Sequence, residues 1–230
     1  METGATVAQR ESGYERKERD AYMTPAWVTQ ALVDDLEREG FLPLHGHDNA
    51  GKLKPLAIWE PAAGTGQMAD AMAGRGYEVF CTDIQPEPGV GFAHDFTEPT
   101  LPVLFPAQIG GVITNPPYDQ ADEFVEVALR MMEARGGLVA MLLKVDWDSG
   151  KTRRRFFADC QGWARKLVLL DRIYWFDPVP GSAGPSENHA WFVWSFARRH
   201  VGRGASIGYV ETPAAERDRL RACKKGKIAA

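Results

Sequence analysis

A short polar and aromatic motif directly follows an apolar run in this chain. Residues 109–114 read as a buried strand, and Asn115, Pro116, Pro117 and Tyr118 come at its end. The two prolines fix φ and remove backbone donors, so they end the strand and stiffen the chain after it. The Asn115 side chain and the Pro116 carbonyl are then two fixed hydrogen-bond acceptors beside an aromatic ring. This arrangement can hold a flat molecule that carries an amino group.

A glycine-rich turn forms a second candidate motif. It follows a strand predicted over Leu56–Glu60, and Gly64 and Gly66 lead from that strand into a helix. Glycines here let the backbone approach a ligand, and the helix N-terminus offers N–H groups. The full G-x-G-x-x-G motif is absent because residue 69 is alanine. Taken alone, the turn is as typical of a tight strand–helix connection as of a ligand site.

Two carboxylates follow at spacings that suit a nucleoside. Asp83 ends the next predicted strand about twenty residues on, where an acid accepts hydrogen bonds from ribose hydroxyl groups in nucleotide-binding α/β sheets. Asp95, followed by Phe96, is placed to bind an adenine amino group and to pack against its ring. Each acid alone is more often a solvated loop residue. The ordered set predicts a nucleoside site at the carboxyl ends of strands.

The elements that must position these motifs alternate between helix and strand. Thr24 and Pro25 are expected to open a helix that runs to Gly40, with Thr24 as its cap and Pro25 in the first helical position. Further helices are predicted through residue 73, over 121–134 and over 152–160. Seven strands are predicted, over residues 56–60, 77–82, 109–114, 138–145, 166–171, 190–197 and 206–210. Such alternation predicts a mostly parallel sheet with helices on both faces.

Composition sets the outer limits. The chain has 230 residues and 44% hydrophobic residues, which suits one α/β domain of generous size. No apolar run approaches the length of a membrane span, and the first twenty residues lack a signal-peptide core. Three cysteines without close or metal-like spacing fit a reducing compartment, so we predict a cytoplasmic protein without a metal. His45 and His47 lie in a polar loop with no third ligand nearby. His189 precedes an aromatic strand, where packing is the expected role.

Charge is divided unevenly along the sequence. Residues 1–149 contain 11 Lys and Arg against 24 Asp and Glu, whereas residues 150–230 contain 16 against 7. This asymmetry suggests an acidic body with a basic face and a polyanionic partner. Cations that merely solvate surface helices are an equal alternative. We divide the chain into a flexible arm (1–20), a catalytic domain (21–212) and a basic C-terminal tail (213–230).

The motifs, in this order, resemble those of class I S-adenosylmethionine-dependent methyltransferases. The elements are E-P-A-x-G-x-G from Glu60, the acid Asp83, D-F at Asp95 and N-P-P-Y from Asn115. More narrowly they resemble the amino-methylating branch typified by N6-adenine DNA methyltransferases, including small phage-type members. The segment D-A-Y-M-T-P, with Tyr22 and Thr24, matches a Y-x-T-P element of some members. The resemblance covers roughly residues 20–200 and implies a Rossmann-like, doubly wound α/β fold with a seven-stranded sheet.

The resemblance implies S-adenosyl-L-methionine as cofactor and DNA as partner. Asn115 and Pro116 would accept hydrogen bonds from adenine N6, so that the nitrogen pyramidalises toward the methyl donor. Tyr118 would stack on the base after it leaves the duplex. The implied catalytic residues are Asn115, Pro116, Pro117 and Tyr118. The implied cofactor-binding residues are Tyr22, Thr24, Glu60, Pro61, Ala63, Gly64, Gly66, Asp83, Ile84, Asp95, Phe96 and Asn115.

The sequence leaves open the target specificity and the molecule that accepts the methyl group. The basic tract of Lys151, Arg153, Arg154 and Arg155 is predicted to contact phosphates, with a solvated helix face as the alternative. The chain has no room for the separate recognition domain of restriction-associated enzymes, and RNA stays open as a substrate. Enzymes that methylate a glutamine side-chain amide share the N-P-P-Y motif. A non-catalytic nucleic-acid-binding module of the same fold is the remaining alternative. The sequence predicts neither the target motif nor the oligomeric state.

Overall fold

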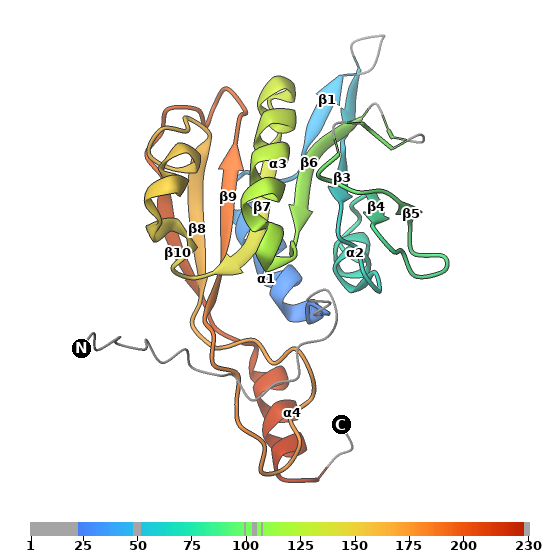
Figure 1. The fold of residues 1–230 in the computed structure, drawn as a ribbon, viewed down its shortest axis with the longest axis vertical. Coiled ribbons are helices and arrows are strands. Elements are labelled where there is room, and N and C mark those ends of the chain that lie inside the picture. The colour runs from blue at the N-terminus through green and yellow to red at the C-terminus, as the bar shows by residue number, and fades with distance from the viewer. Residues whose placement is uncertain (1–22, 48–51, 99, 103–104, 107, 228–230) are drawn as a thin grey trace, which may run out of the picture.

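An eight-stranded sheet forms the centre of the molecule (Figure 1). The computed structural model describes residues 23–227 except 48–51, 99, 103–104 and 107. The predicted arm and Tyr22 therefore lie outside the described residues. The sheet order is β10-β8-β9-β7-β6-β3-β4-β5. Its strands are β3 (Ala57–Glu60), β4 (Val79–Asp83), β5 (Phe92–Ala93), β6 (Ile109–Thr114), β7 (Leu138–Lys144), β8 (Trp163–Leu169), β9 (His189–Ser195) and β10 (Ser206–Val210).

The predicted Rossmann-like, mostly parallel fold is confirmed, with one strand more than expected. Strand β9 pairs antiparallel with β7 and β8, and the other pairings in this sheet are parallel. The additional strand is β5, whose two residues are too few to leave a periodic pattern in the sequence. A separate antiparallel hairpin, β1 (His45–His47) and β2 (Leu53–Pro55), occupies the segment expected to be a polar loop.

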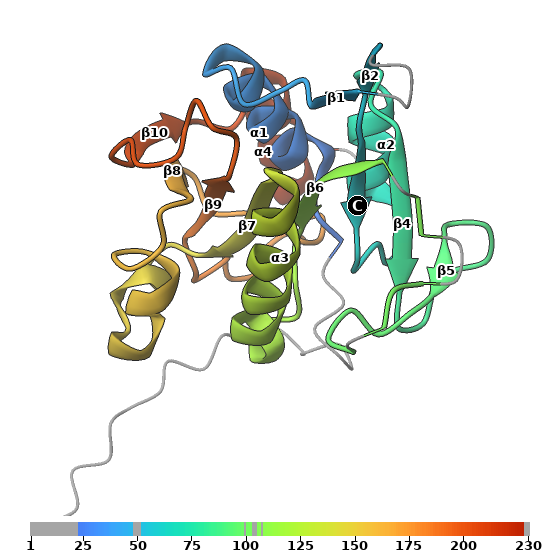
Figure 2. The same ribbon diagram turned by 90° about the horizontal axis from the view of Figure 1, so that it is seen from above.

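Helices cover both faces of the sheet, as Figure 2 shows from above. Helices α1 (Ala26–Arg38) and α2 (Gln67–Ala73) share one apolar cluster with the sheet. Helix α3 (Ala121–Arg135) packs on the opposite face around Trp59, Val112 and Met141. The predicted basic helix over 152–160 is instead a 3-10 helix, η4 (Lys151–Phe156), after the short η3 (Trp147–Ser149). It too joins the cluster of α3, through Phe156.

Helix α1 is attached to the distant half of the sheet by polar bonds. The guanidinium of Arg165 in β8 donates to both carboxylate oxygens of Asp35 in α1, at 2.6 and 2.8 Å. Both side chains are nearly buried, with 6% and 2% exposed. The indole nitrogen of Trp191 in β9 donates to the Val28 carbonyl at 3.1 Å. Because breaking a buried ion pair leaves an uncompensated charge, these bonds fix α1 firmly over β8 and β9.

The C-terminal segment forms a helix beyond the sheet. Strand β10 runs parallel to β8, and α4 (Ala214–Lys224) follows it. In Figure 1 this helix hangs below the edge at which the parallel strands end, beside the connection between β8 and β9. The ring of Tyr174 in that connection lies 5.0 Å from the ammonium of Lys224. Helix α4 therefore lies on the same side of the sheet as the loops that carry the predicted motifs.

Candidate functional site

The predicted motifs meet at the carboxyl edge of the sheet, where β3 and β6 are neighbours. After β3 the chain enters α2 on one face, and after β6 it enters α3 on the other. In open α/β sheets such a reversal creates a crevice outside the strand ends, and ligands bind there. Glu60 ends β3 and Thr114 ends β6 on either side of this point. The fold thus brings the glycine-rich turn and the N-P-P-Y loop side by side.

Asp83 organises the glycine-rich turn. Its carboxylate accepts hydrogen bonds from the Gly64 N–H and the Gln85 N–H, both at 2.9 Å. The Ala63 N–H donates to the Thr82 carbonyl at 3.0 Å, which joins the turn to β4 a second time. Gly64 and Gly66 have φ values of +51° and +85°, a conformation that favours glycine. The pairing of turn and acid was predicted; the bonds that hold the turn against the acid were not.

Glu60 is a buried carboxyl group between β3 and β6. Its Oε1 atom accepts hydrogen bonds from the Thr114 hydroxyl and, at 3.3 Å, from the Ala62 N–H. Oε2 is buried and has no hydrogen-bond partner among the described residues. Burial raises the pKa of Glu60 to about 8, against the opposing effect of the two hydrogen bonds, and the nearby charge of Asp83 raises it slightly further. Glu60 is therefore mainly protonated at neutral pH, with one oxygen available to a donor.

The Asn115 side chain is held by the segment before α1. Its Nδ2 atom donates to the hydroxyl of Thr24 at 3.1 Å, and Thr24 is buried. The expectation that Thr24 caps α1 is wrong: the N-cap is Pro25, and no side chain caps this helix N-terminus. Because the hydroxyl accepts from Asn115, the plane of the Asn115 amide is fixed. The side-chain oxygen of Asn115 then has a defined direction, as a preorganised acceptor requires.

The ring of Tyr118 belongs to an aromatic group. It stacks on His189, with ring centroids 5.7 Å apart and planes at 26°, and Trp175 meets the same imidazole edge-on at 5.2 Å. Burial, with a smaller effect from Lys144, lowers the pKa of His189 to about 4, so this ring is neutral at pH 7. His189 has the packing role expected for it. Trp175 was not singled out, although three successive aromatic residues, 174–176, were a signal in the sequence.

The remaining cofactor candidates differ in accessibility. Asp95 accepts hydrogen bonds from the N–H and hydroxyl of Thr97 at 2.9 and 2.7 Å, and these bonds lower its pKa. Phe96 is only 2% exposed and packs edge-on against Trp59, with centroids 4.8 Å apart. Most of the Phe96 ring is therefore part of the core. By contrast, Ile84 directly after Asp83 has 58% of its surface exposed, an apolar face beside a carboxylate.

The predicted basic tract is paired with carboxylates. Arg153 donates to Asp122 at 2.9 Å and to the carbonyl of Trp147 at 3.0 Å, and its guanidinium lies over the Trp147 ring. Arg154 pairs with Asp159 and Arg155 with Glu126. These pairs offset the charge that the tract can offer to a phosphate. Lys151 is exposed at the start of η4.

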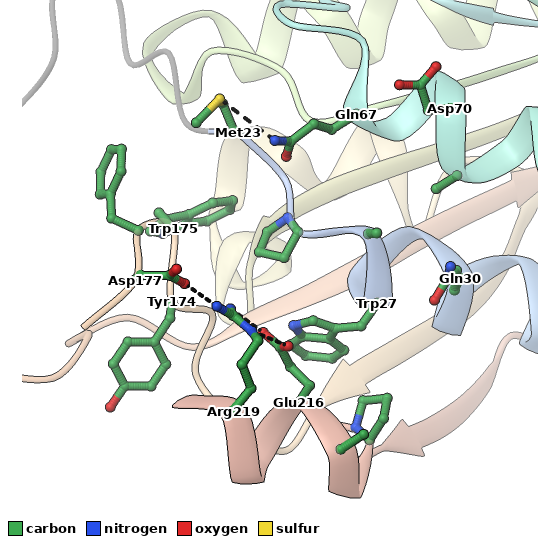
Figure 3. A pocket seen from close by; sticks show the side chains of 16 residues that line it. Met23, Trp27, Gln30, Gln67, Asp70, Tyr174, Trp175, Asp177, Glu216 and Arg219 are labelled. Atoms are coloured by element: carbon green, nitrogen blue, oxygen red, sulfur yellow. Dashed lines mark hydrogen bonds and ion pairs between the residues drawn. The ribbon is translucent and has the colours of Figure 1, made fainter. Parts of the chain in front are cut away.

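A cavity of about 1170 Å³ lies beside this site, between the start of α1, α2, residues 174–177 and α4 (Figure 3). Met23 and Gln67 border it on one side and Trp175 on another. Arg219 of α4 donates to Asp177 at 2.6 Å and to Glu216 at 2.8 Å, so an ion-paired group forms its floor. None of the predicted site residues that the structure describes lines this cavity.

Several solved structures with the same architecture are described as methyltransferases. A Listeria monocytogenes protein described as a class I S-adenosylmethionine-dependent methyltransferase superposes with a TM-score of 0.52 at 12% identity, over 89% of this chain and 72% of that one. A Pyrococcus horikoshii protein described as an RNA methyltransferase gives 0.53 at 16% identity, over 76% and 87% of the two chains. The methyltransferase subunit of a type I restriction-modification system from Streptococcus thermophilus gives 0.51 at 12% identity; the match covers 91% of this chain and 54% of that subunit. The chain has the Rossmann-like fold of these methyltransferases.

Sequence comparison adds no closer relative. No protein-family model matches the chain, and no curated protein matches it. Among the described residues, no group of three or more His, Cys, Asp or Glu side chains is arranged to hold a metal ion. Within the same residues, no helix combines the length and apolar character needed to cross a membrane.

Proposed function

We propose that this protein is an S-adenosylmethionine-dependent methyltransferase that methylates the N6 amino group of adenine in DNA. The observation that carries the proposal is the fixed Asn115 amide, held by Thr24 at the carboxyl edge where β3 and β6 meet. An acceptor with a fixed direction beside an aromatic ring suits an exocyclic amine. The same edge carries a glycine-rich turn held by Asp83, which suits a nucleoside cofactor.

The residues at the glycine-rich turn fit the cofactor. Asp83 would accept hydrogen bonds from the ribose hydroxyl groups, and exposed Ile84 would cover one face of the adenine. Gly64 and Gly66 would let the backbone pass close to the amino-acid end, near Pro61 and Ala63. Glu60, with an unpartnered buried oxygen, would accept from the cofactor's ammonium group after losing its proton, and the positive charge of that group would favour the loss. When bound, S-adenosylmethionine supplies an activated methyl group, so neither a metal nor a covalent enzyme intermediate is required.

The N-P-P-Y loop would position the acceptor. Adenine N6 is a poor nucleophile because its lone pair is delocalised into the ring. Hydrogen bonds from the amine to the Asn115 oxygen and the Pro116 carbonyl favour a pyramidal nitrogen whose lone pair points at the methyl group. Pro117 keeps the loop rigid. Tyr118, supported from behind by His189, would stack on the base and offset part of the cost of removing it from a duplex.

Two other acceptors and one non-catalytic alternative are further outcomes of the test. RNA adenine suits the same loop, and one structure of similar fold is described as an RNA methyltransferase. A glutamine side-chain amide suits the two acceptors as well. A protein without methyltransferase activity that binds nucleic acid through this fold is the last alternative.

Transfer of labelled methyl from the cofactor tests the proposal directly. Unmodified genomic DNA, total RNA and translation release factors are offered in parallel, and the products are digested for mass spectrometry. We expect N6-methyladenine from DNA. Label found only as N4-methylcytosine, only in RNA or only on protein would reject the assignment of adenine in DNA. Cofactor binding without transfer to any of the three would support the non-catalytic module.

Replacement of Asn115 and Tyr118 separates chemistry from capture. Asn115→Ala should lower single-turnover methylation by orders of magnitude while cofactor affinity hardly changes, since the amine hydrogen bonds strengthen toward the transition state. Asn115→Asp retains an acceptor and should keep some activity. Tyr118→Ala should weaken substrate capture by roughly 1–3 kcal/mol, and Tyr118→Phe should recover most of that loss. Equal losses in Tyr118→Ala and Tyr118→Phe would show that the ring face is not what matters.

A further inference from the structure

Three successive aromatic side chains follow β8 at the carboxyl edge. Tyr174, Trp175 and Phe176 are all half-buried and line the cavity. Figure 3 shows Tyr174 and Trp175 near Asp177, apart from Asp70 of α2. A partly exposed ring can stack on a nucleobase whatever its identity, because every base has a π-face. The bases of a duplex already stack on one another, so such rings suit an unpaired base. The aromatic run therefore matches a single strand better than a duplex.

The end of α4 next to this run is strongly basic. No carboxylate occurs after Asp218 in the described part of the helix and its C-terminal turn. The cations there are all exposed: Arg221, Lys224, Lys225 and Lys227. Lys224 lies over the Tyr174 ring, with its Nζ atom 5.0 Å from the ring centroid. Cations and stacking surfaces thus lie side by side, the combination that binds single-stranded nucleic acid.

The acidic residues of the cavity do not oppose such a partner at this place. Asp177 and Glu216 are both paired with Arg219, which offsets part of their charge. Asp70 is exposed on α2, on the side of the cavity away from α4. The arrangement suits bases that face the cavity and phosphates that follow the basic end of α4.

The aromatic run is directly connected to the proposed base platform. Trp175 contacts His189 edge-on, and His189 stacks on Tyr118. Two ring contacts therefore separate the run from the ring that would hold the target base. A strand whose target base lies on Tyr118 would bring its neighbouring nucleotides to residues 174–176.

We propose that residues 174–176 and the basic end of α4 form a surface that holds the unpaired nucleotides next to the target base. Tyr174, Trp175 and Phe176 stack on the bases, and Lys224 and Lys225 contact the phosphates. This inference rests on the proposed function and names the form of its substrate: a strand unpaired around the target. It places strand binding on α4 and the β8–β9 connection, apart from the tract at residues 151–155.

Fluorescence anisotropy of a labelled single strand tests the surface. The full chain is titrated with an oligonucleotide of about 12 nucleotides that contains one adenine, and with the duplex of the same sequence. Tyr174→Leu keeps the side-chain bulk but removes the ring; we expect single-strand affinity to fall roughly 5- to 150-fold, and duplex affinity to fall less. Trp175→Tyr keeps a ring and should bind nearly as the parent does.

A charge pair with a matched control completes the test. The slope of log K against log salt is negative. Lys224→Gln with Lys225→Gln should make it less steep by roughly 1.4, the value for two phosphate contacts on a single strand. Arg198→Gln with Arg203→Gln removes the same charge at the opposite edge of the sheet, after β9, and should leave the slope unchanged. Equal slopes in the two double variants, or parental single-strand affinity in folded Tyr174→Leu, would overturn the inference.

Methyl transfer, measured separately, distinguishes failure of this inference from failure of the proposed function. Active enzyme whose α4 and Tyr174 variants bind as the parent does would refute this surface and leave the proposed function intact. A parent protein that binds the cofactor but neither binds nor methylates nucleic acid would refute both.

Discussion

Glu60 offers a measurable link between pH and stability. Its pKa is raised from 4.5 to about 8 by burial in the folded protein, so the folded chain holds this proton more tightly than the unfolded chain does. The tighter binding of this proton stabilises the folded state. That stabilisation is fully present below pH 4.5 and is lost as pH rises toward 8. Each pH unit in that window costs up to roughly 1.4 kcal/mol, since the folded state binds one proton more than the unfolded state. Across the whole window the upper bound is about 5 kcal/mol.

Glu60→Gln removes this titration and nearly preserves the shape of the side chain. Urea unfolding of both proteins without cofactor, at pH 5, 6, 7 and 8, gives the difference in free energy of unfolding. We expect the variant to gain stability relative to the parent with each step up in pH. Glu87→Gln, an exposed position, controls for the loss of one acidic side chain. A Glu60→Gln difference that stays constant over this range would refute a carboxyl group protonated by burial.

Three further predictions concern the site and the basic tract. Asp83→Asn cannot accept both the Gly64 and the Gln85 bonds, and cofactor affinity measured by calorimetry should fall by roughly 1.5–3 kcal/mol; unchanged affinity would remove Asp83 from the site. Thr24→Val removes the acceptor of the Asn115 amide and should reduce single-turnover methylation more than cofactor affinity. Thr24→Ser should restore the rate of methylation. A loss that Thr24→Ser fails to rescue would contradict a role of Thr24 in positioning Asn115. If Arg153, Arg154 and Arg155 contact phosphates, their neutralisation should weaken DNA binding for all sequences alike and flatten its salt dependence; a parental slope would mean that their carboxylate partners hold them.

Local sequence patterns located the strands that end at the site. The predicted strand over 109–114 has the bounds of β6, because an apolar run followed by two prolines leaves little freedom in where a strand ends. Asp83 and the glycine-rich turn were expected to share one edge because each comes at the carboxyl end of a predicted parallel strand. The parallel alternation of strands and helices settles that edge before any side-chain contact is known.

Contacts between residues far apart in the chain could not be predicted from local sequence patterns. Thr24 carries the signature of a helix cap, but its hydroxyl bonds Asn115, 91 residues away, and no local pattern encodes that competition. The raised pKa of Glu60 depends on burial of its carboxyl group between two strands, which the amino-acid composition does not reveal. Residues 213–230 were expected to be a basic tail, but Ala214–Lys224 form α4, in which Cys223 is the buried residue.

The ion pair between Asp35 and Arg165 has a consequence for synthesis on the ribosome. The two residues are 130 positions apart, so at about 5–20 residues per second α1 leaves the ribosome roughly 7–26 seconds before its partner is made. Over that interval β3, β6 and β7 can already cover part of the apolar face of α1, but β8 and β9, whose residues share the same apolar cluster with Trp27 and Leu32, have not been made. Nascent chains that stop short of residue 165 therefore expose the part of α1 that β8 and β9 cover later, and their Asp35 has Arg38 of its own helix but not Arg165 as a partner. Chaperones and proteases can distinguish this form from the completed protein.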